Sequence, residues 1–170
     1  MDLTFENIGF IALVLLTGLS AGLCFAWSNA VTPGIGRLDD LGFLMSFQYM
    51  NRTILNPLFI IVFFGPFFLG LINIYVFRNA SNSLFWLLIL ATVIYFFGIL
   101  LVTVFGNVPL NEMLDKTNLS SASIEELKSL REIFESKWNR LHLIRTLASV
   151  ASFLLLIMSL IQVTKATFKL

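Results

Sequence analysis

A tryptophan, a histidine and an arginine lie close together near the start of the last apolar segment of the chain. They are Trp138, His142 and Arg145, and a turn of about 100° per residue places all three within one arc of a helix. Because an imidazole changes its charge near neutral pH, His142 is a candidate general base. Arg145 stays charged, so within an apolar segment it needs a carboxylate or a bound ligand as its partner.

Two further groups of polar side chains stand at the ends of other apolar segments. The first group falls within one arc of a helix and consists of Gln48, Asn51, Arg52 and Asn56. The second consists of Asn107, Asn111 and Glu112, and its two asparagines share a helical face. Polar side chains in membrane-spanning segments are costly and turn towards the interior of a bundle. We therefore expect the groups to meet, with Glu112 or Glu135 as the partner of Arg52 or Arg145.

The acidic and histidine residues lack the spacing of a metal site. Such a site would have to combine Glu112, Glu135 and His142, which show no tight ligand spacing. Haem held between two histidines is excluded, because the chain contains one histidine. Cys24 has no second cysteine to pair with, and we interpret it as a small buried hydrophobic residue. We expect no metal site.

The segments that must position these groups are long and apolar. Of the 170 residues, 58% are hydrophobic and 12% are charged, against roughly 45–50% and about 25% in soluble domains. Charge-free stretches of about 20 residues can cross the hydrocarbon core of a membrane as helices. We expect spans at about 7–32, 53–77, 84–106 and 143–164. The sequence thus predicts an all-α integral membrane protein, a four-helix bundle in a single domain over residues 1–170, with both termini on the same side.

Two connections between the spans are predicted to be helical. Residues 41–52 show a helical pattern that we expect to run on into the second span. In the last connection, Ser123 followed by Glu126 is a capping box, in which each side chain bonds the backbone amide of the other residue. Apolar residues then recur at helical spacing. We expect an extramembrane amphipathic helix over residues 123–142 that leads into the fourth span.

A stripe of small residues bears on possible partners. Four of them recur at every fourth position of the first span and let another helix approach closely, namely Gly18, Gly22, Ala26 and Ala30. The stripe serves either packing within the chain or contact between two copies in a homo-oligomer. The 11 Lys and Arg residues nearly balance the 10 Asp and Glu residues, which argues against a nucleic-acid partner. The lipid bilayer is the partner that the composition requires.

Several of these residues together resemble the anthrone oxygenase-like family of small four-span membrane proteins. The similarity lies in residues 21–28, 33–34, 47–52, 56–57, 107–111 and 138–146, and it extends over most of the chain. Its most specific part is the Asn-x-Pro-x-Asn element at 107–111, followed by Trp138 and Arg145. For some fungal members the resemblance implies oxygenation of a polycyclic anthrone to a quinone, without a metal or an organic cofactor. Most bacterial relatives have no assigned function, and the location that we expect is the inner (plasma) membrane of a bacterium.

The chemistry implied by the resemblance fits these side chains. A deprotonated anthrone can pass an electron directly to dioxygen, so the protein need supply only a base, oxyanion donors and a dry aromatic pocket. Our hypothesis gives His142 the role of the base and lets Trp138 stack on the ring system of a lipophilic aromatic or quinone-like molecule. The developing oxyanion would be held by Gln48, Asn107, Asn111 and Arg145. Asn51 and Asn56 complete the set of substrate-binding residues.

A non-catalytic interpretation uses the same residues. In it, the polar cluster registers the bundle of a structural or accessory membrane subunit, or binds a lipid head group. A cavity would favour a substrate site if it were lined by Asn107, Asn111, Trp138, His142 and Arg145. A tightly packed polar network would favour the accessory role. A transporter is a third alternative, although the chain is short and lacks a paired repeat.

Overall fold

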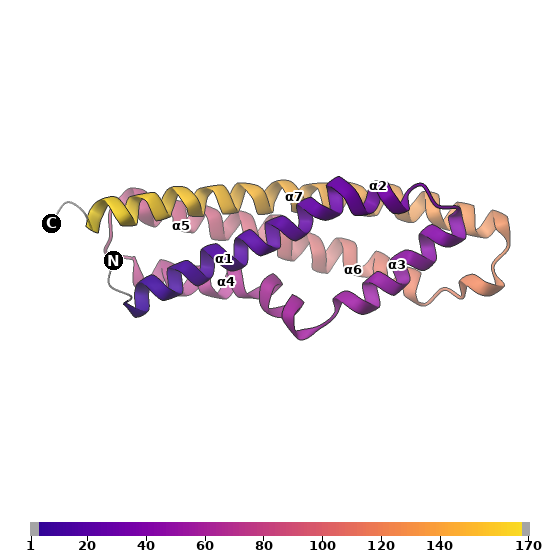
Figure 1. Cartoon of the computed structure of the whole chain (residues 1–170), viewed down its shortest axis with the longest axis horizontal. Helices are drawn as coiled ribbons and strands as arrows, with labels where there is room; N and C mark the ends of the chain where they lie inside the picture. The colour runs from indigo at the N-terminus through magenta and orange to yellow at the C-terminus, as the bar shows by residue number, and fades with distance from the viewer. Residues whose placement is uncertain (1–3, 168–170) are drawn as a thin grey trace.

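Helices make up almost all of the structure, a computed structural model that describes residues 4–167. Their bounds are α1 Phe5–Ala26, α2 Thr32–Ile35, α3 Asp40–Ile54, α4 Pro57–Val76, α5 Asn82–Tyr95, α6 Val108–Asp115 and α7 Ile124–Thr167 (Figure 1). Wider π-helical turns at Trp27–Val31, Phe96–Leu101 and Thr103–Asn107 connect α1 to α2 and α5 to α6. A short 3-10 turn, Leu119–Ser121, precedes α7. Within the described residues there is no strand.

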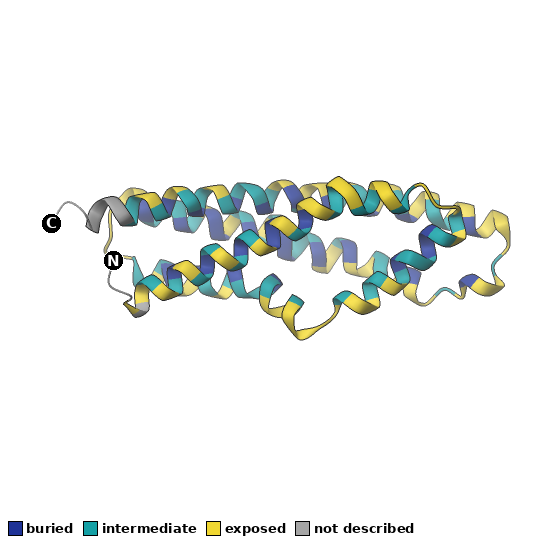
Figure 2. Ribbon diagram, in the orientation of Figure 1, coloured by how far each residue is buried: buried dark blue, intermediate teal, exposed yellow. Residues whose placement is uncertain are grey.

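Four helical stretches in the described part of the chain are long and apolar enough to cross a membrane. They are Glu6–Ile35, Pro57–Val76, Asn82–Asp115 and Ile124–Val163. Their outward faces carry exposed large apolar side chains such as Leu15, Phe68, Trp86 and Leu147. In Figure 2 the exposed residues lie on these outward faces, and the buried ones lie where the helices meet. Lipid accommodates such a surface. The prediction of an all-α, multi-pass membrane bundle is confirmed.

The spans pack around one another in a ring. α1 lies against α4 and α7, and α5 also lies against α4 and α7. α1 begins and α7 ends at the same end of the bundle (Figure 1). Glycines permit two close approaches: a Cβ at Gly70 would lie 2.5 Å from the Thr92 hydroxyl, and a Cβ at Gly98 would collide with Ala148. Small residues therefore set the spacing between α4 and α5, and between the Phe96–Leu101 turn and α7.

The chain leaves helical geometry between α3 and α4, at Leu55 and Asn56. Pro57 is the first residue of α4, and a proline keeps the residue before it out of the α region. The Asn56 side chain caps α4, because its Oδ1 accepts from the Phe59 amide at 3.0 Å. The prediction that residues 41–52 run on into the second span was therefore wrong. α3 is a separate helix, and the second span begins at Pro57 rather than at residue 53.

The start of α7 agrees with the sequence pattern. The Ser123 amide donates to Glu126 Oε2 at 2.8 Å, and the Glu126 amide donates to Ser123 Oγ at 3.3 Å, so the predicted capping box is confirmed. From Ile124 the helix continues for 44 residues. The predicted extramembrane helix and the fourth span are thus one uninterrupted element.

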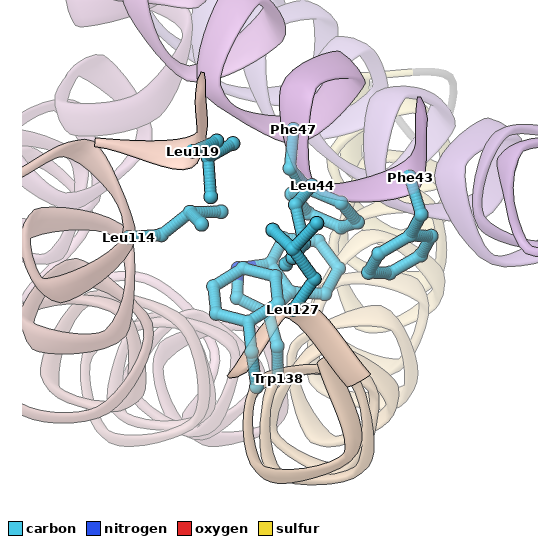
Figure 3. Packing of buried hydrophobic residues seen from close by; sticks show 8 residues of the cluster. Phe43, Leu44, Phe47, Leu114, Leu119, Leu127 and Trp138 are labelled. Atoms are coloured by element: carbon cyan, nitrogen blue, oxygen red, sulfur yellow. The ribbon is translucent and has the colours of Figure 1, made fainter. Parts of the chain in front are cut away.

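An apolar core holds the first half of α7 against α3 and the end of α6 (Figure 3). Its buried residues are Phe43, Leu44, Phe47, Leu114, Leu119, Leu127, Phe134 and Trp138. Beside it, Arg131 on α7 donates to the carbonyls of Gly36 and Leu38, both at 2.8 Å. The same guanidinium pairs with Asp40 at 3.1 Å. The apolar core and the bonds of Arg131 fix α7 relative to α3. They therefore also fix the position of Trp138 along the axis of the bundle.

Candidate functional site

A cavity of about 300 Å³ lies inside the bundle, where the helices change geometry. Its polar and aromatic walls include Trp27, Asn51, Asn111, Trp138, His142 and Arg145. Its apolar walls include Leu23, Leu55, Phe59, Val62 and Phe63. A volume of this size is at the lower end of the range for ligand pockets, about 300–1,000 Å³. The cavity is therefore large enough to hold a small molecule between mostly apolar walls.

Two of the irregular turns beside the cavity precede prolines. A proline lacks the amide that an α-helix directs to the carbonyl four residues earlier. The π turn Trp27–Val31 comes directly before α2, which contains Pro33, and the π turn Thr103–Asn107 comes directly before α6, which contains Pro109. Helical turns of this kind recur at functional sites. The two prolines account for the irregular backbone on two sides of the cavity without ending either helix.

Two tryptophans and the histidine ring form an aromatic wall. The rings of Trp138 and His142 are stacked, with centroids 4.8 Å apart and an interplanar angle of 18°. The Trp27 ring lies 5.5 Å from the Trp138 ring. Trp138 Nε1 donates to Asn111 Oδ1 at 2.8 Å, which fixes the plane of the indole. The wall thus consists of flat rings with fixed orientations that line the cavity, and the rings of Trp138 and His142 are almost fully buried.

Both ring nitrogens of His142 take part in hydrogen bonds. Arg145 Nη2 lies 2.6 Å from His142 Nδ1, and His142 Nε2 lies 3.0 Å from the Cys24 carbonyl oxygen. A guanidinium can only donate and a carbonyl can only accept. Nδ1 therefore accepts and Nε2 donates, which makes His142 a neutral imidazole whose lone pair is occupied by Arg145.

Arg145 has hydrogen bonds but no counter-charge among the residues that the structure describes. Its Nη1 donates to Thr103 Oγ1 at 3.2 Å, and its Cζ lies 5.3 Å from the centre of the Trp138 ring. Within residues 4–167, no carboxylate lies within 4.0 Å of the guanidinium nitrogens. The Nε atom is buried and has no hydrogen-bond partner there. Arg145 is therefore a cation that neutral groups hold in the cavity wall.

The two carboxylates expected beside Arg145 lie elsewhere. Glu135 accepts from Arg131 Nε at 2.8 Å, and Glu112 Oε2 lies 3.6 Å from Lys116 Nζ. The expectation that Glu112 or Glu135 neutralises Arg145 was wrong, because Lys116 pairs with Glu112 and Arg131 pairs with Glu135. In the described part of the chain, no group of three or more His, Cys, Asp or Glu residues is placed to hold a metal ion.

Charged side chains with partners form the rim of the cavity. Arg52, which was expected to pair with the same two carboxylates, instead donates from Nε to Asp115 Oδ1 at 2.7 Å and so joins α3 to α6. Both side chains are about half exposed, at 55% and 47%. Thr103, the partner of Arg145, precedes Glu112 of the rim by nine residues of one continuous helical stretch. It therefore lies on the order of 10 Å deeper in the bundle.

The structure brings five of the predicted site residues around the cavity: Asn51, Asn111, Trp138, His142 and Arg145. They come from α3, α6 and α7. The Asn51 Nδ2 atom is buried and has no hydrogen-bond partner among the described residues. Asn111 accepts the indole N–H of Trp138, so its oxygen is already engaged.

Three of the predicted residues serve the backbone instead of lining the cavity. Gln48 Nε2 donates to the carbonyls of Leu114 at 2.7 Å and Thr117 at 3.0 Å, which ties α3 to the end of α6. Asn56 caps α4, as described above. Asn107 is fully buried, and its Nδ2 donates to a carbonyl of α7 at 3.3 Å. These contacts register the helices around the cavity.

Sequence reasoning missed the contribution of the first span and of Thr103. Ser20, Cys24 and Trp27 line the cavity from α1 and its π turn, and Ser20 Oγ accepts from the Tyr95 hydroxyl at 2.9 Å. Thr103 lies four residues before Asn107, a spacing that could have found it. For α1 the small-residue stripe drew attention to packing and away from the polar residues between its members.

The small-residue stripe divides between two environments. A Cβ at Gly18 would lie 2.9 Å from the Phe153 ring, so Gly18 serves packing between α1 and α7. A Cβ at Gly22 would meet nothing within 4 Å, and Ala26 and Ala30 are exposed. Contact between two copies of the chain through this stripe stays a prediction.

Comparison with known proteins gives one family. A model described as anthrone oxygenase matches residues 56–155, more than half of the chain. The matched part contains Asn111, Trp138, His142 and Arg145, while α1 and α3 lie outside it. No curated protein and no solved structure matches the chain.

Proposed function

The chain belongs to the anthrone oxygenase family, and from that premise we propose that it binds a flat, lipophilic, hydroxylated aromatic molecule in the cavity and oxygenates it with dioxygen, without a cofactor. The observation that carries the proposal is the aromatic wall of Trp27, Trp138 and His142 beside Arg145, a cation without a counter-charge among residues 4–167. The rings favour a flat ligand, and the fixed cation favours negative charge on the oxygen of that ligand.

The reaction that fits this site begins at a ring CH₂ group between two aromatic rings. Loss of one proton to water gives an anion whose charge is shared with the ketone oxygen of the same ring system, where Arg145 stabilises it. The anion passes one electron to dioxygen, and the carbon radical and superoxide combine to a peroxide at that carbon. Loss of the second C–H proton and cleavage of the O–O bond give a carbonyl, while the departing oxygen takes up protons and leaves as water. The carbon loses four electrons and dioxygen gains four.

His142 acts in this scheme through its neutral imidazole. Its Nδ1 accepts from Arg145 and its Nε2 donates to the Cys24 carbonyl, so the ring connects the guanidinium to the backbone of α1. The role of general base would require Nδ1 to release Arg145 first. We therefore assign His142 the role of a positioning residue, which holds the cation where the oxygen of the substrate develops its charge.

The accessory-subunit alternative draws support from Gln48, Asn56 and Asn107, which all bond to backbone. It does not account for a cavity whose wall holds a cation that no described carboxylate neutralises, which costs stability unless a ligand uses the cation. The oxygenase proposal accounts for both the volume and the charge.

Isotope labelling tests the activity. The full-length protein in lipid nanodiscs is incubated with an anthrone under ¹⁸O₂, and the product is analysed by mass spectrometry. We expect one ¹⁸O atom in the new carbonyl and a rate at least about tenfold above that of protein-free nanodiscs, which correct for slow uncatalysed oxidation. Arg145→Gln is expected to remove most of this excess. Arg140→Gln is the matched control, because Arg140 is exposed on the same helix and does not line the cavity. A rate equal to that of empty nanodiscs would refute the proposed activity.

A further inference from the structure

We propose that the cavity binds its aromatic ligand as an anion, with a phenolate or enolate oxygen against Arg145, and that it discriminates against ring systems of the same shape that lack an ionisable hydroxyl. The inference rests on the proposed function, because it presumes an aromatic ligand in the same cavity. It goes further in assigning the charge of the bound ground state. An acidic hydroxyl thus becomes the feature that selects the substrate, and neutral quinones become poor ligands.

The first argument is the charge balance of the buried wall. Arg145 stays protonated in proteins, and a cation within a membrane span is costly unless it has a partner. The two carboxylates that the sequence placed beside Arg145 are already paired, Glu135 with Arg131 and Glu112 with Lys116. An anionic ligand would supply the charge that this part of the structure leaves uncompensated.

The second argument is an excess of hydrogen-bond donors at the deep end of the cavity. Of the five N–H groups of a guanidinium, Arg145 uses one for Thr103 and one for His142. Two acceptors of the cavity wall are engaged, Asn111 Oδ1 by Trp138 and the Cys24 carbonyl by His142. Asn107 Oδ1 is buried without a partner among the described residues, but Asn107 does not line the cavity. A wall whose acceptors are occupied and whose donors remain favours an oxygen that only accepts, which is the property of an oxyanion.

The third argument concerns the origin of the negative charge. Besides Arg145 itself, the titratable and charged groups that line the cavity are Cys24 on α1, Arg52 on α3, Glu112 and Asp115 on α6, Lys116 directly after α6, and His142 on α7. The two carboxylates are paired at the rim, and His142 Nδ1 is occupied. Since no free base among the described residues stands beside Arg145, the ligand gives up its proton to water before or during binding, and the guanidinium retains the ionised form.

Stable anthraquinone dyes test the inference without turnover. The probes are 2-hydroxyanthraquinone, whose visible absorption changes on ionisation, and its methyl ether, 2-methoxyanthraquinone. Binding to the full-length protein in nanodiscs is followed by quenching of tryptophan fluorescence, because Trp27 and Trp138 line the cavity. We expect the ionisation midpoint of the bound hydroxy dye to lie at least one pH unit below its value in empty nanodiscs, which is at least a tenfold preference for the anion. The methyl ether has no hydroxyl to ionise, so any change of its binding with pH measures a change in the protein itself.

Variants connect the shift to Arg145. Arg145→Gln is expected to return the midpoint to that of empty nanodiscs while changing the affinity for the methyl ether less than threefold. Arg145→Lys keeps the charge and is expected to keep most of the shift. Arg140→Gln is expected to behave as the wild type.

The outcomes separate the two proposals. An unshifted midpoint in the wild type, or a shift that survives in Arg145→Gln, would overturn anion binding while leaving the aromatic cavity in place. Failure of both dyes to quench tryptophan fluorescence would overturn the aromatic site and, with it, the inference. The wild-type comparison of the two dyes needs no variant, so a variant that fails to fold does not remove the test.

Discussion

Replacing His142 by two different amides distinguishes a positioning residue from a general base. The asparagine oxygen lies the same number of bonds from Cα as His142 Nδ1, so His142→Asn keeps an acceptor for Arg145. The glutamine nitrogen lies the same number of bonds from Cα as Nε2, so His142→Gln keeps the donor to the Cys24 carbonyl. His142→Leu keeps neither. None of the three side chains can act as a base.

The structure sets the expected magnitude. His142 is only 4% exposed, so water does not readily replace a lost bond. A hydrogen bond to a charged group contributes about 1.5–3 kcal/mol. At about 1.36 kcal/mol per factor of ten, its loss lowers kcat/KM by about 10–150-fold if the bond is fully used in the transition state. We expect this loss in the Gln and Leu variants, and a loss of less than about tenfold in the Asn variant.

The assay is the initial rate of oxygen uptake with an anthrone substrate in nanodiscs, measured across pH for the wild type and all three variants. Thermal unfolding of each variant in the same nanodiscs checks that it is folded. If His142 were the base, Asn and Gln would lose activity equally, by about 10²–10⁴-fold, and the acidic limb of the pH profile, where the base becomes protonated, would disappear from both. Equal losses of that size would refute the positioning role.

Three further substitutions test the packing around the site. Trp138→Phe leaves Asn111 Oδ1 without its donor and should destabilise the bundle by about 1–3 kcal/mol, to be measured by denaturant titration in micelles. Asn56→Ala removes the cap of α4 and should cost about 1 kcal/mol in the same titration while dye affinity stays unchanged, so a loss of dye binding would contradict its purely structural role. Gly98→Val places a side chain against Ala148 and should lower the unfolding temperature markedly, whereas an unchanged temperature would contradict the close approach at that position.

The sequence predicted the membrane-spanning architecture because its signals are local. Long apolar runs predict spans, and the pairing of Ser123 with Glu126 predicts the start of α7, since both depend on neighbours in the chain. The same kind of signal misled at Leu55 and Asn56, where an apolar pattern continues across a point at which Pro57 ends helical geometry. At this point the backbone restriction imposed by Pro57 outweighs the continuous apolar pattern.

The candidate site could be predicted only in part, because a helical wheel gives the face of a residue but not its partner. Gln48 and Asn107 lie on inward faces, yet both bond to backbone and neither lines the cavity. Thr103 went unnoticed although it holds Arg145. The π turn Thr103–Asn107 adds to this difficulty, because a wheel drawn at about 100° per residue loses its phase across such a turn.

The uninterrupted course of α7 determines which sides of the cavity can adapt. Residues 124–167 contain neither proline nor glycine, and at about 1.5 Å per residue the helix is about 66 Å long, roughly twice the thickness of a hydrocarbon core. One stiff, uninterrupted helix therefore holds Trp138, His142 and Arg145, and the distances between these three residues are preserved. The opposing sides of the cavity contain Pro33, the non-helical residues Leu55 and Asn56 before α4, and the π turns Trp27–Val31 and Thr103–Asn107. A helix bends most readily at positions of this kind. Ring systems of different width would be accommodated by bending at those positions, while Trp138, His142 and Arg145 keep their places on α7.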